Sequence, residues 1–356
     1  MTTHAHAFSL APRSRRSALV RQARISLAAA LALTLAAAVG CTSTGAGNAE
    51  PAQTNAATTA AMQRAMLADA ALMQPDELAA LLADPQTASR VAILDTRASA
   101  DFLASHIVGS RSVDLPAWTE RSRQQGGSLL GDASAVGQWQ EIIDPLGLRS
   151  DHRIVLVDAG AMTDAARVWF LLQCFGVENV SVLDGGYKQA GQRLPRNLIL
   201  RGPARPVEPV APENRLTLRA GGSPLVELAL KQDVLDVATA PAEQRGAQVI
   251  DGRSFAEFAG TERMNNPRAG HIPGAISVPH VEVLDRAGFM LPPESLRKHF
   301  SLRGVVPGKP IIVHCQGGGR SSLLSLALVR AGYSPVKNYY LSFAEWAADE
   351  SCPLEK

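Results

Sequence analysis

The chain carries one pattern of segments twice, and this repeat constrains its fold more than any other feature. The paired segments are VAILDTR with QVIDGR, SHIVGS with GHIPGA, RIVLVDAG with PIIVHCQG, and GGYKQA with LSFAEW. Their spacing is kept, since Asp251 stands 156 residues after Asp95 and Cys315 stands 157 residues after Asp158. Similarity at one fixed period across several segments indicates a repeated structural unit. The sequence therefore predicts two domains of the same fold, with a short insertion around 261–267 in the second.

Within each copy, short apolar runs alternate with longer helical stretches. The runs are VAIL and IVLV in the first copy and QVI and IIV in the second, and the helical stretches are DAARVWFLLQCFG and SSLLSLALVRAGY. Continuous apolar runs rich in β-branched residues are typical of parallel strands that are buried on both faces. We therefore predict an α/β fold in which each copy is a parallel β-sheet flanked by helices on both faces.

The two copies are expected to occupy residues 73–195 and 223–356. Between them, the linker 196–222 contains RNLILRGPARPVEPVAPENR, which is rich in proline and has no helical period. A chain of 356 residues is long enough for two domains of roughly 100 to 200 residues each.

The N-terminal region differs in composition from the rest of the chain. Five arginines precede the uncharged run ISLAAALALTLAAAV at 25–39, which is too short to span a bilayer comfortably and is typical of an export signal. The run ends Ala-Val-Gly-Cys at Cys41 and resembles a bacterial lipoprotein signal, in which the cysteine is acylated. We therefore expect residues 1–40 to be a lipoprotein-type signal peptide, Cys41 to be the lipidation site, and 41–72 to be a flexible tether. An ordinary cleaved signal with an incidental Cys41 is the alternative, and Ser-Arg-Arg at 14–16 leaves twin-arginine export open.

Export and charge together limit the expected partners. An exported lipoprotein would lie on the periplasmic side of a bacterial membrane, held by its N-terminal lipid, and without the lipid it would be periplasmic. A net charge of +2, and the lack of a Lys/Arg stripe with interleaved aromatic residues, argue against a nucleic-acid partner. No metal is expected, because the eight histidines are scattered and no Cys-x-x-Cys or His-Glu-x-x-His spacing occurs. Glycine-rich dinucleotide fingerprints are also lacking, so no cofactor is expected.

The chemistry is concentrated where the strand-like run IIVHC ends at Cys315. Three glycines at 317–319 allow the backbone to curl so that several N–H groups point to one centre, and a helix is expected from about Ser321 or Ser322, either of which could cap it. These donors and the positive end of the helix dipole favour an anion, so the pKa of Cys315 should be lowered. Simple packing of a buried thiol is the alternative. His314 should point away from Cys315, because side chains alternate along a strand, and a structural role is expected for it.

The length of this loop resembles that of one enzyme family. Protein tyrosine phosphatases place five residues between the reactive cysteine and the arginine, whereas four residues separate Cys315 from Arg320. The shorter loop resembles that of rhodanese-type sulfurtransferases, and the chain also carries motifs similar to that family's, RAGHIPGA at 268–275 and Asp-Gly-Arg at 251–253. Asp158 holds the position of the cysteine in the first copy, as in members whose N-terminal domain is inactive. The resemblance, to the tandem-domain thiosulfate and 3-mercaptopyruvate sulfurtransferases, implies two rhodanese-like domains of which the second is catalytic.

The same resemblance implies a sulfurtransferase that acts by double displacement. Sulfane sulfur would pass from thiosulfate or a related anionic donor to Cys315 as a persulfide, and then to a thiophilic acceptor such as cyanide or a thiol. Arg253 and Arg320 would bind the anionic group of the donor. For Arg253 the alternative is a salt bridge to Asp251, and for Arg320 it is a solvent-facing position in the first helical turn. The chain is expected to act as a monomer. Cys315 would be the catalytic residue, and the expected donor-binding residues are Arg320, Arg253, Gln316, Gly317, Gly318, Gly319 and Ser321.

Three other functions stay open at this point. The donor could be 3-mercaptopyruvate instead of thiosulfate. A phosphatase or arsenate reductase would use a similar thiolate, although the loop is too short for it and no nearby aspartate stands out as the general acid. A module that senses or binds sulfane sulfur without turnover belongs to a different class, and the intact loop around Cys315 disfavours it.

Overall fold

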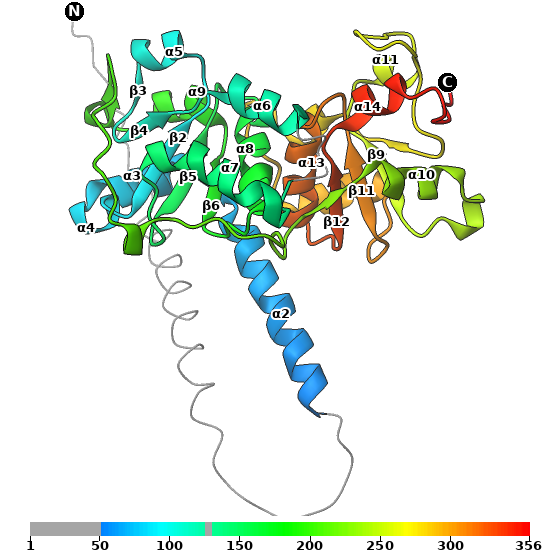
Figure 1. Ribbon diagram of the computed structural model, residues 1–356, viewed down its shortest axis with the longest axis horizontal. Helices are drawn as coiled ribbons and strands as arrows, with labels where there is room; N and C mark the ends of the chain where they lie inside the picture. Colours follow the sequence, from blue (N-terminus) through cyan, green and yellow to red (C-terminus); the bar gives the residue numbers. More distant parts are fainter. Residues whose placement is uncertain (1–50, 125–129) are drawn as a thin grey trace, which may run out of the picture. The chain divides into compact units, whose positions relative to one another are not determined.

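The computed structural model describes residues 51–124 and 130–356, with side chains from residue 56 onward (Figure 1). The sheet strands of the first copy are β1 (Leu72–Met73), β2 (Val91–Asp95), β4 (Ser110–Ser112), β5 (Arg153–Val157) and β6 (Val180–Leu183). Its helices are α3 (Pro75–Ala83), α4 (Pro85–Ala88), α5 (Ser99–Ala104), α6 (Leu115–Gln124), α7 (Ala133–Ile143), α8 (Thr163–Cys174) and α9 (Gly186–Arg193). The strands of the second copy are β8 (Glu227–Ala229), β9 (Gln248–Asp251), β10 (Ile276–Ser277), β11 (Ile311–His314) and β12 (Val336–Tyr339). Its helices are α10 (Lys231–Thr239), α11 (Phe255–Phe258), α12 (Pro293–Leu302), α13 (Gly319–Arg330) and α14 (Ser342–Ala348).

The two sheets have the same strand order, as a repeated unit requires. The first sheet runs β1-β6-β5-β2-β4, and the second, in the same direction, runs β8-β12-β11-β9-β10. All neighbouring strands in both sheets are parallel. Parallel neighbours need crossover connections, which the helices between the strands supply. The predicted α/β fold with two repeated parallel sheets is confirmed.

Alternate residues of each central strand enter two different apolar cores. In β5, Ile154 and Leu156 contribute to a core that contains residues of both copies, whereas Val155 and Val157 contribute to a core that belongs to the first copy alone. Strand β11 divides its residues in the same way. Helices α8 and α13 lie in the shared core and pack against each other. The loop that leads into α13 is therefore placed beside the first copy.

The linker between the copies is attached to the first copy at two points. Strand β7 (Ile199–Leu200) pairs antiparallel with β3 (His106–Ile107). Further along, Arg215 forms an antiparallel bridge with Arg149. The predicted linker 196–222 thus contains one short strand and runs along the first copy before β8 begins.

The segment before the first copy differs from the sequence expectation. Residues 41–72 are expected to form a flexible tether, but α2 is helical from Pro51 to Ala70. A scarcity of large apolar residues prevents a core but not a helix, and alanine, the commonest residue here, has the highest helix propensity. The end of α2 is held by Arg330, which donates to the carbonyl oxygen of Asp69 at 2.8 Å, and Leu72–Met73 then joins the first sheet. The tether prediction is wrong for the described part of this segment.

The predicted signal peptide, residues 1–40, and the predicted lipidation site, Cys41, lie outside the described residues. Within 51–124 and 130–356, none of the helices is both long enough and apolar enough to cross a membrane. Export and lipidation therefore stay predictions from the sequence.

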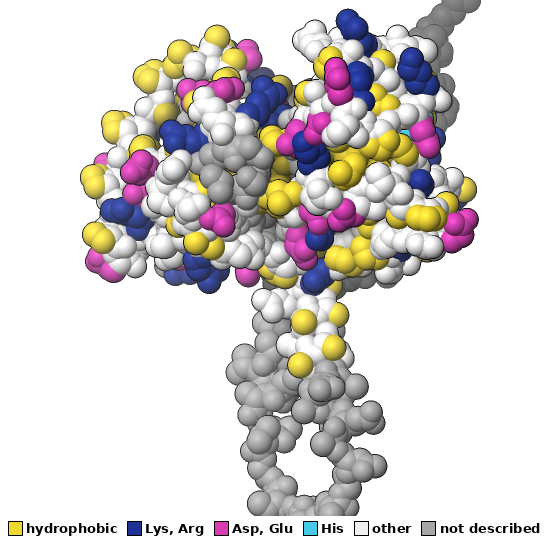
Figure 2. Space-filling view, turned by 45° about the vertical axis from the view of Figure 1, so that its right-hand side comes forward, with side chains coloured by type: hydrophobic (Ala, Val, Ile, Leu, Met, Phe, Trp, Pro, Cys, Tyr) yellow, Lys and Arg dark blue, Asp and Glu magenta, His cyan; other side chains and the backbone are white. Residues whose placement is uncertain are grey.

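Charged side chains of both signs are mixed on one face of the molecule (Figure 2). On the face shown in Figure 2, Lys and Arg lie among Asp and Glu rather than in one continuous stripe. In the described part of the chain, no group of three or more His, Cys, Asp or Glu side chains is placed to hold a metal ion.

Candidate active site

Cys315 directly follows β11, and its side chain faces the first copy. Because residues alternate along a strand, Cys315 shares the direction of Ile311 and Val313, which enter the shared core, and it is 1% exposed. His314 points the other way, is fully buried, and stacks on Phe343 with ring centroids 6.5 Å apart. Burial lowers the pKa of His314, which favours the neutral ring. This geometry agrees with the structural role expected for His314.

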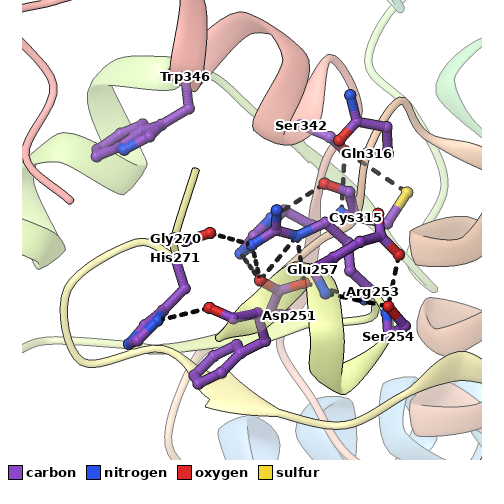
Figure 3. Close-up of polar contacts among 12 residues, drawn as sticks. Asp251, Arg253, Ser254, Glu257, Gly270, His271, Cys315, Gln316, Ser342 and Trp346 are labelled. Atoms are coloured by element: carbon purple, nitrogen blue, oxygen red, sulfur yellow. Dashed lines mark hydrogen bonds and ion pairs between the residues drawn. The ribbon is translucent and has the colours of Figure 1, made fainter. Parts of the chain in front are cut away.

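The loop after Cys315 places a backbone donor on the sulfur. The N–H of Gly318 donates to Sγ at 3.2 Å, and the hydroxyl oxygen of Ser321 lies 3.6 Å from it. The hydroxyl oxygen of Ser342 lies 3.8 Å from the sulfur (Figure 3). Gly318 has a φ of +97°, and a Cβ at this position would lie 2.6 Å from the ring of Tyr340. Glycine is therefore required here both by the backbone conformation and by the close approach of Tyr340.

Helix α13 begins two or three residues earlier than the sequence suggests. Its first residue is Gly319, and Gly318 takes the N-cap position. The hydroxyls of Ser321 and Ser322 donate to the carbonyl oxygen of Gly318 at 3.0 and 2.6 Å, whereas a cap residue would accept a bond from a backbone N–H. The expectation that one of these serines caps the helix is wrong. Because only three residues separate Cys315 from the first residue of α13, the positive end of this helix lies close to the sulfur.

The surroundings of Cys315 lower the pKa of its thiol. Burial by itself would raise this pKa, because it disfavours the charged thiolate. The positive charge of Arg320, the hydroxyl of Ser321 and the N–H groups of Gly317 and Ser321 outweigh burial, so the pKa lies below its ordinary value. The thiolate is the nucleophilic form, and the site is therefore arranged for attack by sulfur.

Arg320 is held by a carboxylate that sequence reasoning missed. Its guanidinium donates two hydrogen bonds to Glu257, at 2.6 and 2.8 Å. Burial opposes ionisation of Glu257, but hydrogen bonds from Arg320 and Ser254 lower the pKa of this carboxyl to about 2. Arg320 is 22% exposed and lines the cavity beside Cys315. It therefore does not take the solvent-facing position that was the alternative to donor binding. The capping box Ser-x-x-Glu at the start of α11 was the available signal for Glu257.

Arg253 lies behind the site. Its guanidinium donates to the Asp251 carboxylate at 2.6 to 3.0 Å and to the carbonyl oxygen of Gly270 at 2.8 Å (Figure 3). It also lies over the ring of Phe343, 3.6 Å from the centroid, and is 1% exposed. Of the two roles expected for Arg253, the salt bridge to Asp251 is the one that the structure shows. Through Gly270, it ties the Gly-His-Ile-Pro-Gly motif to the end of β9.

Gln316 is fixed by the insertion that distinguishes the second copy. The side-chain amides of Gln316 and Asn266 exchange two hydrogen bonds, at 2.7 and 3.0 Å. Asn266 belongs to the segment 261–267 that the broken spacing of the repeat indicated. Sequence reasoning assigned this insertion no role, and the structure shows that it braces the loop after Cys315.

The first copy reaches the loop through Arg167. Its Nη1 donates to the carbonyl oxygen of Gly317 at 2.8 Å and to the hydroxyl oxygen of Tyr340 at 3.0 Å. Tyr340 stands 156 residues after Asp184, so the two residues hold equivalent positions of the repeat. Asp184 also contacts the other copy, because its carboxylate accepts a hydrogen bond from the N–H of Met290 at 2.8 Å. Equivalent positions of the repeat therefore join the two copies at two places, one of which holds the loop after Cys315.

A cavity of about 220 Å³ opens beside Cys315 between the two copies. Its size suits a small donor, since pockets that bind drug-sized ligands measure roughly 300 Å³ or more. Among the expected donor-binding residues, Gly318, Ser321 and Arg253 do not line it. The lining residues are Arg123, Thr163, Asp164 and Arg167 from the first copy, and Cys315, Gln316, Gly317, Gly319 and Arg320 from the second.

The equivalent loop of the first copy is occupied by a carboxyl group of its own. Asp158 follows β5 as Cys315 follows β11, and its carboxylate accepts hydrogen bonds from the N–H groups of Gly160 and Asp164 at 2.8 and 3.3 Å. The side chain is buried, and burial raises the pKa of Asp158. A carboxylate cannot carry sulfane sulfur, so covalent transfer is possible at the second loop but not at the first.

Comparisons with known proteins agree with this geometry. The family described as Rhodanese-like domain matches residues 74–192 and 235–349, so both loops lie within a match. The 3-mercaptopyruvate sulfurtransferase of Escherichia coli (strain K12) is 31% identical over 263 residues, which cover 73% of this chain and 87% of that protein. The thiosulfate sulfurtransferase of Bos taurus is 27% identical over 251 residues, which cover 69% of this chain and 78% of that protein.

A solved structure shares the arrangement. The crystal structure of SseA from Escherichia coli, a 3-mercaptopyruvate sulfotransferase described as having the rhodanese fold, matches with a TM-score of 0.58 and 28% identity. The match covers 76% of this chain and 97% of that chain, so it extends over both copies.

Proposed function

The chain belongs to the rhodanese family and is a sulfurtransferase, and we propose that it moves sulfane sulfur from thiosulfate to a thiophilic acceptor through a persulfide on Cys315. The observation that carries this proposal is the position of Sγ. It lies 3.2 Å from the N–H of Gly318, at the positive end of α13, and beside a small cavity. Donors in this position stabilise a developing sulfur anion, and the lowered pKa of Cys315 supplies the thiolate.

The proposed reaction has two displacement steps. In the first, the thiolate of Cys315 attacks the outer sulfur of thiosulfate, a new S–S bond forms, the S–S bond of thiosulfate breaks, and sulfite leaves with the bonding electron pair. In the second, cyanide attacks the terminal sulfur of the persulfide and leaves as thiocyanate, which restores the Cys315 thiolate. A thiolate acceptor would leave as a persulfide in the same way. Atoms and electrons balance without an added oxidant or reductant.

Mass spectrometry of the purified protein tests this proposal directly. After incubation with thiosulfate, the peptide that contains Cys315 is expected to gain about 32 Da, one sulfur atom, and cyanide should remove the gain and release thiocyanate. Cys174 and Cys352 are buried away from the cavity and serve as internal controls that should stay unmodified. If neither thiosulfate nor 3-mercaptopyruvate produced the gain, the transferase assignment would be contradicted and a binding or sensing module would be favoured.

The alternative donor is 3-mercaptopyruvate. The relative with 31% identity is named a 3-mercaptopyruvate sulfurtransferase, and this name supports the alternative. Parallel incubations with the two donors separate them. An adduct that forms with 3-mercaptopyruvate alone would replace the donor in our proposal and leave the persulfide route intact.

We also propose that the protein is exported and anchored by a lipid at Cys41. The uncharged run 25–39 behind five arginines and ahead of Cys41 supports this proposal. Cells that express the chain and grow with labelled palmitate should incorporate the label, and Cys41→Ala should abolish incorporation. Unlabelled wild-type protein would rule out the anchor.

A further inference from the structure

We infer that Arg123, which comes from the copy without a reactive cysteine, is a donor-binding residue that favours a dianionic donor over a monoanionic one. This inference rests on the proposed function and deepens it, because it names the charge class of donor that the cavity takes. It also gives the first copy a part in the reaction that its own loop, filled by Asp158, cannot have.

Arg123 lies at the C-terminal end of α6, directly over the loop of the second copy. It lines the cavity of about 220 Å³ that contains Cys315 and also an adjoining cavity of about 200 Å³. Its Nη2 is 3.5 Å from the point that a Cβ on Gly317 would occupy. The guanidinium therefore overlies the backbone beside the sulfur, where the anionic group of a donor would enter.

The other guanidinium groups of this cavity are already engaged. Arg320 makes two hydrogen bonds to the Glu257 carboxylate, and Arg167 donates to Gly317 and Tyr340. Of the arginines that line the cavity, Arg123 is the one whose side chain has neither a hydrogen-bond acceptor nor a carboxylate partner within residues 51–124 and 130–356. Its donors are free to bind oxygen atoms of a ligand, for which the planar guanidinium fork is suited.

A donor with two negative charges depends on the charge of Arg123 more than a donor with one. The Glu257 carboxylate offsets Arg320, and Asp164, an acidic residue that lines the cavity, interacts with Arg167. The Cys315 thiolate lies in the same cavity and repels an incoming anion, and Arg123 supplies the remaining positive charge that offsets this repulsion. Coulomb attraction scales with the charge of the ligand, so thiosulfate with two charges gains more from Arg123 than 3-mercaptopyruvate with one.

Steady-state kinetics with Arg123→Gln test the inference. With cyanide as acceptor, the KM for thiosulfate is expected to rise about tenfold while kcat changes little, because the lost contact acts on donor binding. The KM for 3-mercaptopyruvate should rise by a smaller factor, and Arg123→Lys should restore part of the thiosulfate affinity. Arg121→Gln is the matched control, since Arg121 is exposed on the same helix, lines neither cavity, and should leave both KM values unchanged.

The outcomes separate this inference from the proposed function. An unchanged KM for thiosulfate in Arg123→Gln, or an equal rise in Arg121→Gln, would overturn the inference while sulfur transfer stands. Wild-type protein that accepts 3-mercaptopyruvate but not thiosulfate would also overturn it. Wild-type protein that forms a persulfide with neither donor would mean that the proposed function itself fails, and the inference would fall with it.

Discussion

Replacement of Cys315 by serine is expected to lower sulfur transfer from thiosulfate to cyanide by roughly 10³-fold or more, to the rate of the uncatalysed reaction. The serine hydroxyl does not ionise near neutral pH, and its oxygen cannot hold sulfane sulfur as a persulfide. The loop that lowers the pKa of Cys315 remains in place in this variant. The loss of turnover therefore measures the contribution of the nucleophile itself rather than that of the loop around it.

The measurement is the rate of thiocyanate formation, together with thermal unfolding. Serine is close to cysteine in volume, so the melting temperature should fall by only a few degrees despite the buried position. Asp158→Asn is the matched control, because Asp158 holds the equivalent place in the first copy and is expected to leave most of the turnover intact. Turnover that persisted in Cys315→Ser would rule out the persulfide route.

Gly318→Ala is expected to lower turnover by about 10²-fold and the free energy of unfolding by about 1–3 kcal/mol. At a φ of +97° an alanine is strained, and its Cβ would meet ring carbons of Tyr340 at 2.6 and 2.7 Å and the Tyr340 carbonyl oxygen at 2.9 Å. Tyr340 is 1% exposed and cannot move aside freely. The loop must shift instead, which takes the Gly318 N–H away from the sulfur.

Gly317→Ala is the control for this substitution. Gly317 does not have a positive φ, and the nearest atom to its added Cβ would be the flexible end of Arg123 at 3.5 Å, an ordinary contact distance. Its losses in kcat/KM and in urea-unfolding free energy should be clearly smaller than those of Gly318→Ala. Equal losses in the two variants would show that the conformation at Gly318 is not the property that the site requires.

Local sequence pattern was sufficient for the elements that carry the site. The apolar runs became parallel strands because a strand buried on both faces needs apolar side chains at successive positions. The two copies could be aligned from their residues alone because duplicated units keep their spacing. The position of Cys315 at a glycine-rich turn ahead of a helix followed from the same kind of local signal. Helix α2 was not predicted, because a scarcity of large apolar residues was taken to exclude regular structure. The start of α13 was misplaced, because helix boundaries depend on caps and contacts that composition does not contain.

Most contacts that organise the site join residues far apart in the chain. The Arg320–Glu257 pair spans 63 residues, the Gln316–Asn266 pair 50, and the Arg167–Gly317 bond 150. No periodicity links such positions. Their approach depends on how the helices pack on each sheet and how the two copies pack together.

The sequence by itself determined the duplicated α/β fold, the place of Cys315 at a glycine-rich turn and the aspartate at the equivalent position of the first copy, because each depends on residues next to one another or at one constant spacing. Only the tertiary structure decided that Arg253 serves the scaffold, that Glu257 holds Arg320, and that Arg123 and Arg167 of the first copy overlie the loop of the second. The physical reason is that the shared core holds α8 against α13. This packing directs the sulfur toward the first copy, and charged side chains of the first copy complete the cavity beside it.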